Sequence, residues 1–440
     1  MFRKNPAVAG AAGNGRLRVG RSGSCRTAVP PNKIERMKFL RKIGLLPRVV
    51  IAIALGIGCA AFFPTWLARV FATVNGIFGN FLGFSIPLII LGLVAPGIAE
   101  LGRGAGRLLG LTTLLAYGST LLAGFFSYFT CRWVYPIILD PAGGVNPVEA
   151  AQTSPFQPYF TVEMPPLMGV MTALLLAFVL GLGLSAVRGD VLRRSLSEFR
   201  EVVSLLIGRA IIPLLPLYIF GIFLKMGVEG QVASILSLFL KIIALIFVMH
   251  VLLLLFQYGV AGLVSKRNPL ALLRTMLPAY FTALGTQSSA ATIPVTLERT
   301  IRNGVNPELA GFVIPLNATI HLSGSILKIV ACAMAIMWMA GMPATTGLYA
   351  GFILMLGITM IAAPGVPGGA IMAALGLLHS TLGFDESLQG LMIALYIAMD
   401  SFGTAGNVTG DGAIAVVVDR IYRKSSAETA TPNHPNDENQ

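Results

Sequence analysis

Long apolar segments, separated by short polar ones, follow one another from Leu46 almost to Val418. The first six occupy about residues 46–64, 69–99, 107–139, 165–187, 203–226 and 231–264. A helix needs roughly 20 apolar residues to cross a bilayer, whereas the strands of a membrane barrel show only a short, weak alternation. The pattern therefore predicts an all-α membrane protein with six transmembrane helices in residues 46–264.

After residue 268 the pattern changes. The apolar segments 269–298 and 343–383 are interrupted by GTQSSAATIP and APGVPGGAIM, and each is followed by a run with a polar centre, 307–341 and 386–418. Non-helical backbone is tolerated at membrane depth only where protein or a watery cavity surrounds it. We therefore predict eight transmembrane helices plus two re-entrant helical hairpins, each hairpin followed by a polar-centred helix. Interrupted segments in corresponding halves are typical of a transporter's binding site.

Basic residues orient these segments. They follow the second, fourth and sixth segments: Arg103, Arg107, Arg188, Arg193, Arg194, Arg200, Lys266 and Arg267. The connection from Asp140 to Glu163 contains none. Because basic loops face the cytoplasm, both termini are predicted to be cytoplasmic in a multi-pass protein of the plasma membrane, here a bacterial inner membrane. The first hairpin then enters from the cytoplasm and the second from outside, so the repeats are inverted.

The composition and the absence of certain motifs exclude several classes of function. The 440 residues are 55% hydrophobic and 12% charged, which leaves no room for a large soluble domain. The net charge is +13, and the basic residues are concentrated near the N-terminus and in short loops. This distribution is typical of a membrane protein oriented by its basic loops, and it argues against nucleic-acid binding. The absence of phosphate-binding and nucleophile-elbow motifs argues against ATP-driven transport and against an enzyme, and no cofactor is expected.

These patterns divide the chain into four parts. Residues 1–45 form a basic N-terminal segment that we expect to be disordered, with Met37 as an alternative start. Residues 46–264 hold the six helices, 265–418 hold the transport core, and 419–440 form a cytoplasmic tail.

Polar residues recur on one face of the last segment. Asp400, Thr404, Asn407 and Asp411 are separated by steps of four, three and four, the spacing of a helical face. Acidic side chains at membrane depth are costly and usually face a cavity, a cation or a titrating proton. A helix-packing face with satisfied hydrogen bonds is the alternative interpretation, but two acids without a basic partner in the same helix favour a binding site.

Two basic side chains lie in the run 307–341. His321 and Lys328 are seven residues apart, which predicts one helical face. A neutral, hydrogen-bonded histidine is an equally good interpretation of His321. Lys328 needs either a partner or a path along which its stem reaches water.

Four motifs, QSSAATIP, PLNATIHLSGS, GVPGGAIM and DSFGTAGNVTGD, resemble in order and spacing the dicarboxylate/amino acid:cation symporter family, the glutamate transporter homologues. The resemblance covers about residues 47–424 and is most specific over 280–412. It implies a homotrimer in membrane lipid, with a scaffold from the first, second, fourth and fifth helices. The third and sixth helices, both hairpins and the last two helices would form a transport domain that moves like an elevator.

The same resemblance implies a binding site. Ser289 and Asn407 would contact the substrate α-carboxylate and Asp400 its α-amino group, while Asn407, Asp411 and carbonyls near Asn317 would bind one sodium ion. Val366, Pro367 and Gly368 would form the gate. The remaining members of the expected substrate site are Ser288, Ser325, Gly403 and Thr404.

The sequence departs from the family pattern at several places. Gly403 stands where members that carry acidic substrates have an arginine, the natural partner of a second carboxylate. His321, Leu322 and Ser323 replace an asparagine–methionine–aspartate element, which removes a carboxylate from a sodium site. Lys328 stands at a normally uncharged position, so His321 and Lys328 are candidates for a proton or charge role. The second hairpin tip is also one residue short.

The leading hypothesis is a secondary active symporter that imports a small neutral amino acid with sodium. The alternative within the fold is a proton-coupled symporter of a dicarboxylate or another organic acid, with Lys328 supplying positive charge. A channel or a non-transporting membrane sensor is the third hypothesis, because two of the sequence signatures of the family are altered in this chain.

Overall fold

The computed structural model describes residues 45–101, 107–139, 157–187, 189–228, 232–361, 363 and 367–429. The chain divides into two units, Met1–Ile43 and Gly44–Gln440. The first unit, with the predictions about a disordered segment and a start at Met37, lies outside the described residues. The second unit contains all the structure described below.

Regular structure in the described part of the chain is entirely helical, as predicted. The helices before residue 266 are α2 (Leu45–Ala60), α3 (Thr65–Leu101), α4 (Arg107–Ile138), α6 (Val170–Ala186), α7 (Val191–Leu206), the π-helical turn η1 (Ile207–Ile211), α8 (Ile212–Val228) and α9 (Val232–Ser265). They follow the six apolar segments, except that α7 extends the fifth segment toward its N-terminus. Among the described residues, five helices are long and apolar enough to cross a membrane, or six if one bent pair is a single span.

Two helix pairs stand at the predicted interruptions. The first pair, α10 (Pro269–Thr286) and α11 (Ser289–Arg302), is joined at Gln287, whose φ of 53° is left-handed. The second pair is α14 (Thr346–Ile361) and α15 (Gly369–Leu382), and α15 begins after Gly368, whose φ of 73° favours glycine. Both interruptions fall where small and polar residues predicted them. Re-entry of either pair into a membrane remains a prediction.

Each polar-centred run is interrupted within its length; the first still counts as one candidate span, Pro307–Met339, and the second is the bent pair. The first run forms α12 (Pro307–Ile320) and α13 (Ser323–Met339), with a break at His321 and Leu322. The second forms α16 (Glu386–Ala398) and α17 (Asp400–Thr429), bent by 60° just before Asp400. A break exposes backbone N–H groups that polar side chains can satisfy, which explains why the polar residues gather there.

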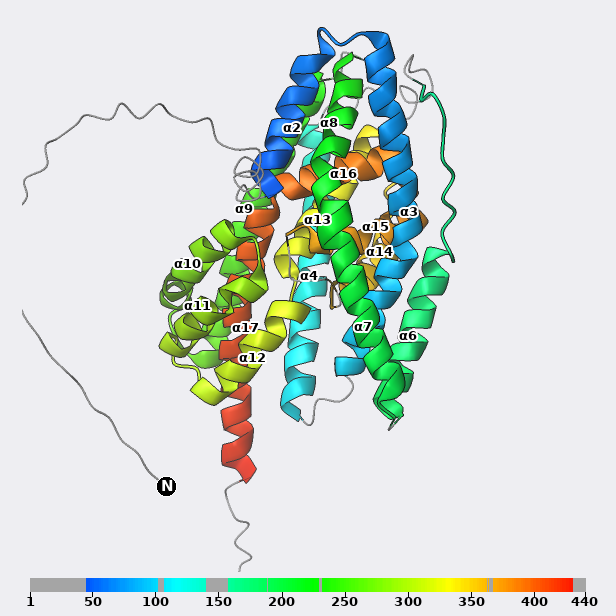
Figure 1. Ribbon diagram of the computed structural model, residues 1–440. Helices are drawn as coiled ribbons and strands as arrows, with labels where there is room; N and C mark the ends of the chain where they lie inside the picture. Colours follow the sequence, from blue (N-terminus) through cyan, green and yellow to red (C-terminus); the bar gives the residue numbers. More distant parts are fainter. Residues whose placement is uncertain are drawn as a thin grey trace, which may run out of the picture. The chain divides into compact units, whose positions relative to one another are not determined.

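The helices pack in two groups. In the first, α2 packs against α8, and α3 packs against α6, α7 and α8. In the second, α4 and α9 pack against α13 and α17, while α10, α11 and α12 pack around α17, as Figure 1 shows. Residues Ser323–Met337 of α13 are buried throughout, so this helix lies in the interior. The polar face of α17 meets the start of α13 in the second group.

Candidate functional site

The predicted polar face of α17 is buried. Asp400, Thr404, Asn407 and Asp411 are 4%, 7%, 2% and 1% exposed. Three of them contact the stretch from His321 to Lys328, so the acids and the basic residues singled out in the sequence lie at one helix–helix contact. Their partners differ along this contact, and three clusters can be distinguished.

The first cluster is the start of α13. The Asn407 side-chain oxygen accepts hydrogen bonds from the backbone N–H of Gly324, at 2.8 Å, and of Ser325, at 3.2 Å. Its amide nitrogen donates to the Ser325 hydroxyl at 3.0 Å. A side chain on another helix thus satisfies N–H groups that the first turn of α13 leaves without a helical partner. Both lone pairs of the Asn407 oxygen are used, and its nitrogen keeps one N–H for a ligand.

The second cluster surrounds Asp400. Lys328 Nζ donates to Asp400 Oδ1 at 2.8 Å, and both side chains are buried, at 0% and 6% exposed. Asp400 Oδ2 accepts from the backbone N–H of Gly368 at 2.8 Å, so the start of α15 is tied to α17. Asp400 was predicted to bind an ammonium group, and in the structure it binds the ammonium of Lys328.

Gly403 provides the space for Lys328. A Cβ atom built on Gly403 would lie 2.7 Å from both Cε and Nζ of Lys328, closer than real Cβ contacts allow. The Lys328 ammonium also lies 3.5 Å from the ring centroid of Tyr396, a cation–π contact. The lysine therefore lies beside the position where a side chain at residue 403 would begin.

The third cluster surrounds His321. Its Nδ1 lies 2.8 Å from Asp411 Oδ1, and its Nε2 lies 3.1 Å from the Ser119 hydroxyl of α4. Gln257 of α9 donates to the hydroxyls of Ser119, at 3.0 Å, and Ser323, at 3.1 Å. The carboxylate predicted to bind sodium therefore has a histidine partner.

One geometric prediction about these residues was wrong. His321 and Lys328 do not share a face of one helix, because His321 lies in the break before α13, with φ −104° and ψ 95°. Both still reach α17, but His321 contacts Asp411 and Lys328 contacts Asp400.

The remaining predicted residues lie nearby or outside the described region. Ser288 caps α11 and accepts from the Ala291 N–H, and Ser289 is 5% exposed at the first position of that helix. Thr404 donates to the Asp400 carbonyl within α17. Pro367 precedes Gly368, whereas Val366 lies outside the described residues, so the gate is described only in part.

Asn317 of α12 differs from the other polar residues. Its side chain is fully buried, and neither its amide oxygen nor its amide nitrogen has a hydrogen-bond partner among the described residues. Buried amide groups are almost always paired, because leaving one unpaired costs free energy. This side chain is therefore suited to a polar ligand.

Three residues of these clusters, Ser119, Gln257 and Tyr396, were not predicted from the sequence. Ser119 and Gln257 are isolated polar residues in apolar segments, a signal that could have selected them. Tyr396 lies four residues before Asp400 but belongs to α16, on the other side of the 60° bend. Its contact with Lys328 depends on that bend, which the sequence pattern did not predict.

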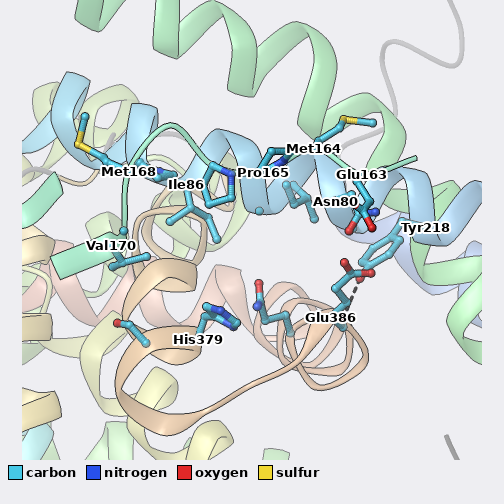
Figure 2. A pocket seen from close by; sticks show the side chains of 18 residues that line it. Asn80, Ile86, Glu163, Met164, Pro165, Met168, Val170, Tyr218, His379 and Glu386 are labelled. Atoms are coloured by element: carbon cyan, nitrogen blue, oxygen red, sulfur yellow. Dashed lines mark hydrogen bonds between the residues drawn. The ribbon is translucent and has the colours of Figure 1, made fainter. Parts of the chain in front are cut away.

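A cavity of about 570 Å³ lies elsewhere, between α3 and α8 on one side and α15 and α16 on the other. Figure 2 shows Asn80 and Ile86 of α3 and Glu163, in the segment before α6, facing His379 of α15 and Glu386 of α16. The Tyr218 hydroxyl of α8 donates to the Glu386 carbonyl at 2.8 Å, the dashed line in the figure. None of the predicted site residues lines this cavity, so it is distinct from the predicted site.

Comparison with known proteins decides the family. Residues 45–421 match the sodium:dicarboxylate symporter family. The chain belongs to this family. Its predicted membership is thereby confirmed, and the protein is a multi-pass membrane symporter rather than an enzyme.

Individual relatives are more distant. The serine/threonine transporter SstT of Acinetobacter baumannii (strain AYE) is 26% identical over 89% of this chain and 100% of its own length. SstT of Enterococcus faecalis is 24% identical over 89% of this chain and 95% of its own. Mouse excitatory amino acid transporter 5 is 31% identical, but over only 38% of this chain and 30% of its own. The family name implies sodium as the coupling ion.

Proposed function

We propose that the protein is a secondary active symporter that imports a small neutral amino acid together with sodium, by an elevator movement of α4 and α9–α17 against α2, α3, α6, α7 and α8. The SstT relatives are named as serine/threonine transporters and match along nearly their whole length, which supports an amino acid of this size. The most extensive helix contacts lie within one group or the other, such as α2 with α8 and α10 with α17, which supports the division into transport domain and scaffold; α15 and α16 contact α2, α3 and α8 where the two groups meet.

The buried Lys328–Asp400 pair is the main support for a neutral amino acid as the substrate. Its two charges sum to zero, and a neutral amino acid zwitterion likewise has one positive and one negative group. An acidic amino acid or a dicarboxylate brings a further carboxylate, and Gly403 supplies no guanidinium for it. Burying that extra charge without a partner would be costly, so the site favours a net-neutral substrate.

The unpaired Asn317 side chain supports sodium coupling, whereas the contact between His321 and Asp411 argues against it. The unpaired amide oxygen of Asn317 is a suitable ligand for a hard cation. Asp411, however, contacts His321, and this contact favours the second candidate, in which a proton replaces sodium as the coupling ion. The sodium ligands Asn317, Asn407 and Asp411 remain predictions.

Uptake into proteoliposomes tests both the substrate class and the coupling ion. Purified protein is supplied with radiolabelled serine, alanine, aspartate or succinate, under an imposed sodium gradient or an imposed proton gradient. We expect saturable accumulation of serine and alanine that requires sodium. Accumulation driven by protons alone would reject sodium coupling, preferential uptake of aspartate or succinate would reject the substrate class, and flux that never exceeds equilibrium would indicate a channel.

A further inference from the structure

Lys328 is an unusual feature of this site. It is completely buried in α13. Among the described residues its ammonium contacts Asp400, the Tyr396 ring and, at 3.5 Å, the Met399 carbonyl, which belong to or adjoin the predicted substrate site. A buried lysine that only stabilised the fold could be replaced by an apolar residue at little cost, provided its partner were replaced too. Its place beside the predicted ammonium-binding carboxylate calls for a functional explanation.

Through Asp400 the lysine is connected to the second helix pair. One carboxylate oxygen binds Lys328 and the other accepts the Gly368 N–H, so a single side chain joins α13, α17 and the start of α15. Negative charge on Asp400 strengthens both hydrogen bonds, because charge-assisted hydrogen bonds are the stronger ones. This arrangement ties the start of α15 to Asp400.

We propose that Lys328 is a tethered ammonium group that occupies the substrate's ammonium position in the empty carrier and binds the substrate's carboxylate in the loaded one. The inference rests on the proposed function. When a zwitterion enters, its ammonium replaces Lys328 on Asp400, and Lys328 turns to the carboxylate. Two ion pairs replace one, and no unpaired charge is left in the membrane interior.

The lysine side chain suits this exchange. It carries a compact charge on a flexible four-carbon stem, which can move a short distance while its backbone stays in α13. Gly403 leaves the stem unobstructed, since the Cβ of any other residue there would lie 2.7 Å from Cε and Nζ, too close for the present position of the stem. Lys328 thereby determines specificity: it requires a carboxylate on the substrate, because an amine alone would displace the lysine and leave it unpaired.

The experiment compares wild-type protein with Lys328→Met, which keeps the length of the stem and removes its charge. Serine and ethanolamine are the probes, since ethanolamine keeps the ammonium and hydroxyl groups but lacks the carboxylate. In the variant we expect the KM for serine to rise about tenfold or more, because the carboxylate loses its partner. We also expect ethanolamine to inhibit serine uptake and to raise the melting temperature of the purified variant, while it does neither with wild type.

Two further variants serve as controls. Lys328→Arg keeps the positive charge and should exclude ethanolamine as wild type does. If Lys328→Met does not fold, Lys328→Met with Asp400→Glu provides a longer carboxylate free of the lysine, and ethanolamine should still stabilise it. An unchanged KM for serine, or ethanolamine binding that is equal in wild type and in the charge-free variants, would overturn the inference. Failure of wild type to transport any amino acid would instead reject the proposed function.

Discussion

The buried ionisable side chains of the candidate site pair across helices rather than within one. Asp400 pairs with Lys328 and Asp411 with His321, and in both pairs the acid belongs to α17 while the basic residue lies in or just before α13. Each pair is buried, so removal of one partner leaves the other without compensation. Replacing one member of a pair should therefore be more harmful than replacing both members.

Replacement of Asp400 tests the first pair. Asp400→Asn leaves Lys328 buried and without its counter-charge, and loss of one partner of a buried ion pair costs about 3–5 kcal/mol. We expect a large fall in the free energy of unfolding, measured in detergent by thermal or denaturant unfolding, together with loss of serine binding. The double variant Asp400→Asn with Lys328→Met should recover most of the stability but not the binding. Equal stabilities of the single and double variants would contradict the pairing.

Replacement of Asp411 tests the predicted sodium site. Asp411→Asn keeps the shape of the side chain but removes its charge, so the sodium concentration for half-maximal uptake should rise about tenfold. The KM for serine at saturating sodium should change little, because Asp411 is not placed in the substrate site. Glu308→Gln, at an exposed acid in the first turn of α12, is the matched control. Identical sodium dependence in the two variants would remove Asp411 from the sodium site.

Part of this site was predictable from residue types alone. Helical spacing placed Asp400, Asn407 and Asp411 together, and the cost of charge in a bilayer selected Lys328 and His321. The pairings were not predictable, because they depend on the register of α13 against α17 and on the break at His321. Tyr396 escaped prediction for a similar reason, since the bend before Asp400 brings it to Lys328.

Elements in this fold approach one another through glycine. A Cβ atom on Gly324 of α13 would lie 2.5 Å from the backbone carbonyl of Gly403 in α17, so the two helices cross at these residues. Sequence patterns located both helices and both interruptions because small residues and prolines mark broken backbone. They could not show which glycines permit close packing, since α13 is buried on all its faces over Ser323–Met337 and the sequence does not say which face meets α17.

Gly324→Ala tests this crossing. The added methyl group meets backbone rather than a movable side chain, so α13 and α17 must separate, and overpacking of this kind costs about 1–3 kcal/mol. We expect a lower melting temperature in detergent and a higher KM for serine, since the same shift moves Lys328 away from Asp400. Gly311→Ala in α12, where a Cβ has open space, should be neutral or slightly stabilising. Equal melting temperatures of the two variants would show that the helices are not in close contact.

At the scale of the whole described unit, two groups of helices meet along an incomplete interface. The cavity of about 570 Å³ between α3, residues 163–170 and the ends of α15 and α16 leaves part of this interface unpacked. Loosely packed interfaces between helix groups permit relative movement, whereas tightly packed interiors resist it. Elevator movement therefore predicts that a covalent bond across this interface blocks transport, while one inside the scaffold group does not.

A pair of cysteines across the interface can be placed from the structure. A Cβ on Gly79 of α3 would lie 3.2 Å from Cγ of Glu386 in α16, the position that a cysteine sulfur would take. The control joins α3 to α8 within the scaffold group, where a Cβ on Gly221 would lie 2.7 Å from Cγ of Asn75. Both pairs are within reach of a disulfide after small side-chain adjustments. They are made in a background without Cys25, Cys59, Cys131 and Cys332.

Oxidation of Gly79→Cys with Glu386→Cys should abolish sodium-driven serine uptake, and a reducing agent should restore it, because the disulfide prevents the two groups from sliding past each other. Oxidation of Asn75→Cys with Gly221→Cys should leave uptake unchanged, since both residues would move together. Loss of free thiols, measured by maleimide labelling, verifies that each bond has formed. Full uptake by the oxidised first pair would exclude movement between α3 and α16, and transport would then have to occur by opening of the second helix pair alone.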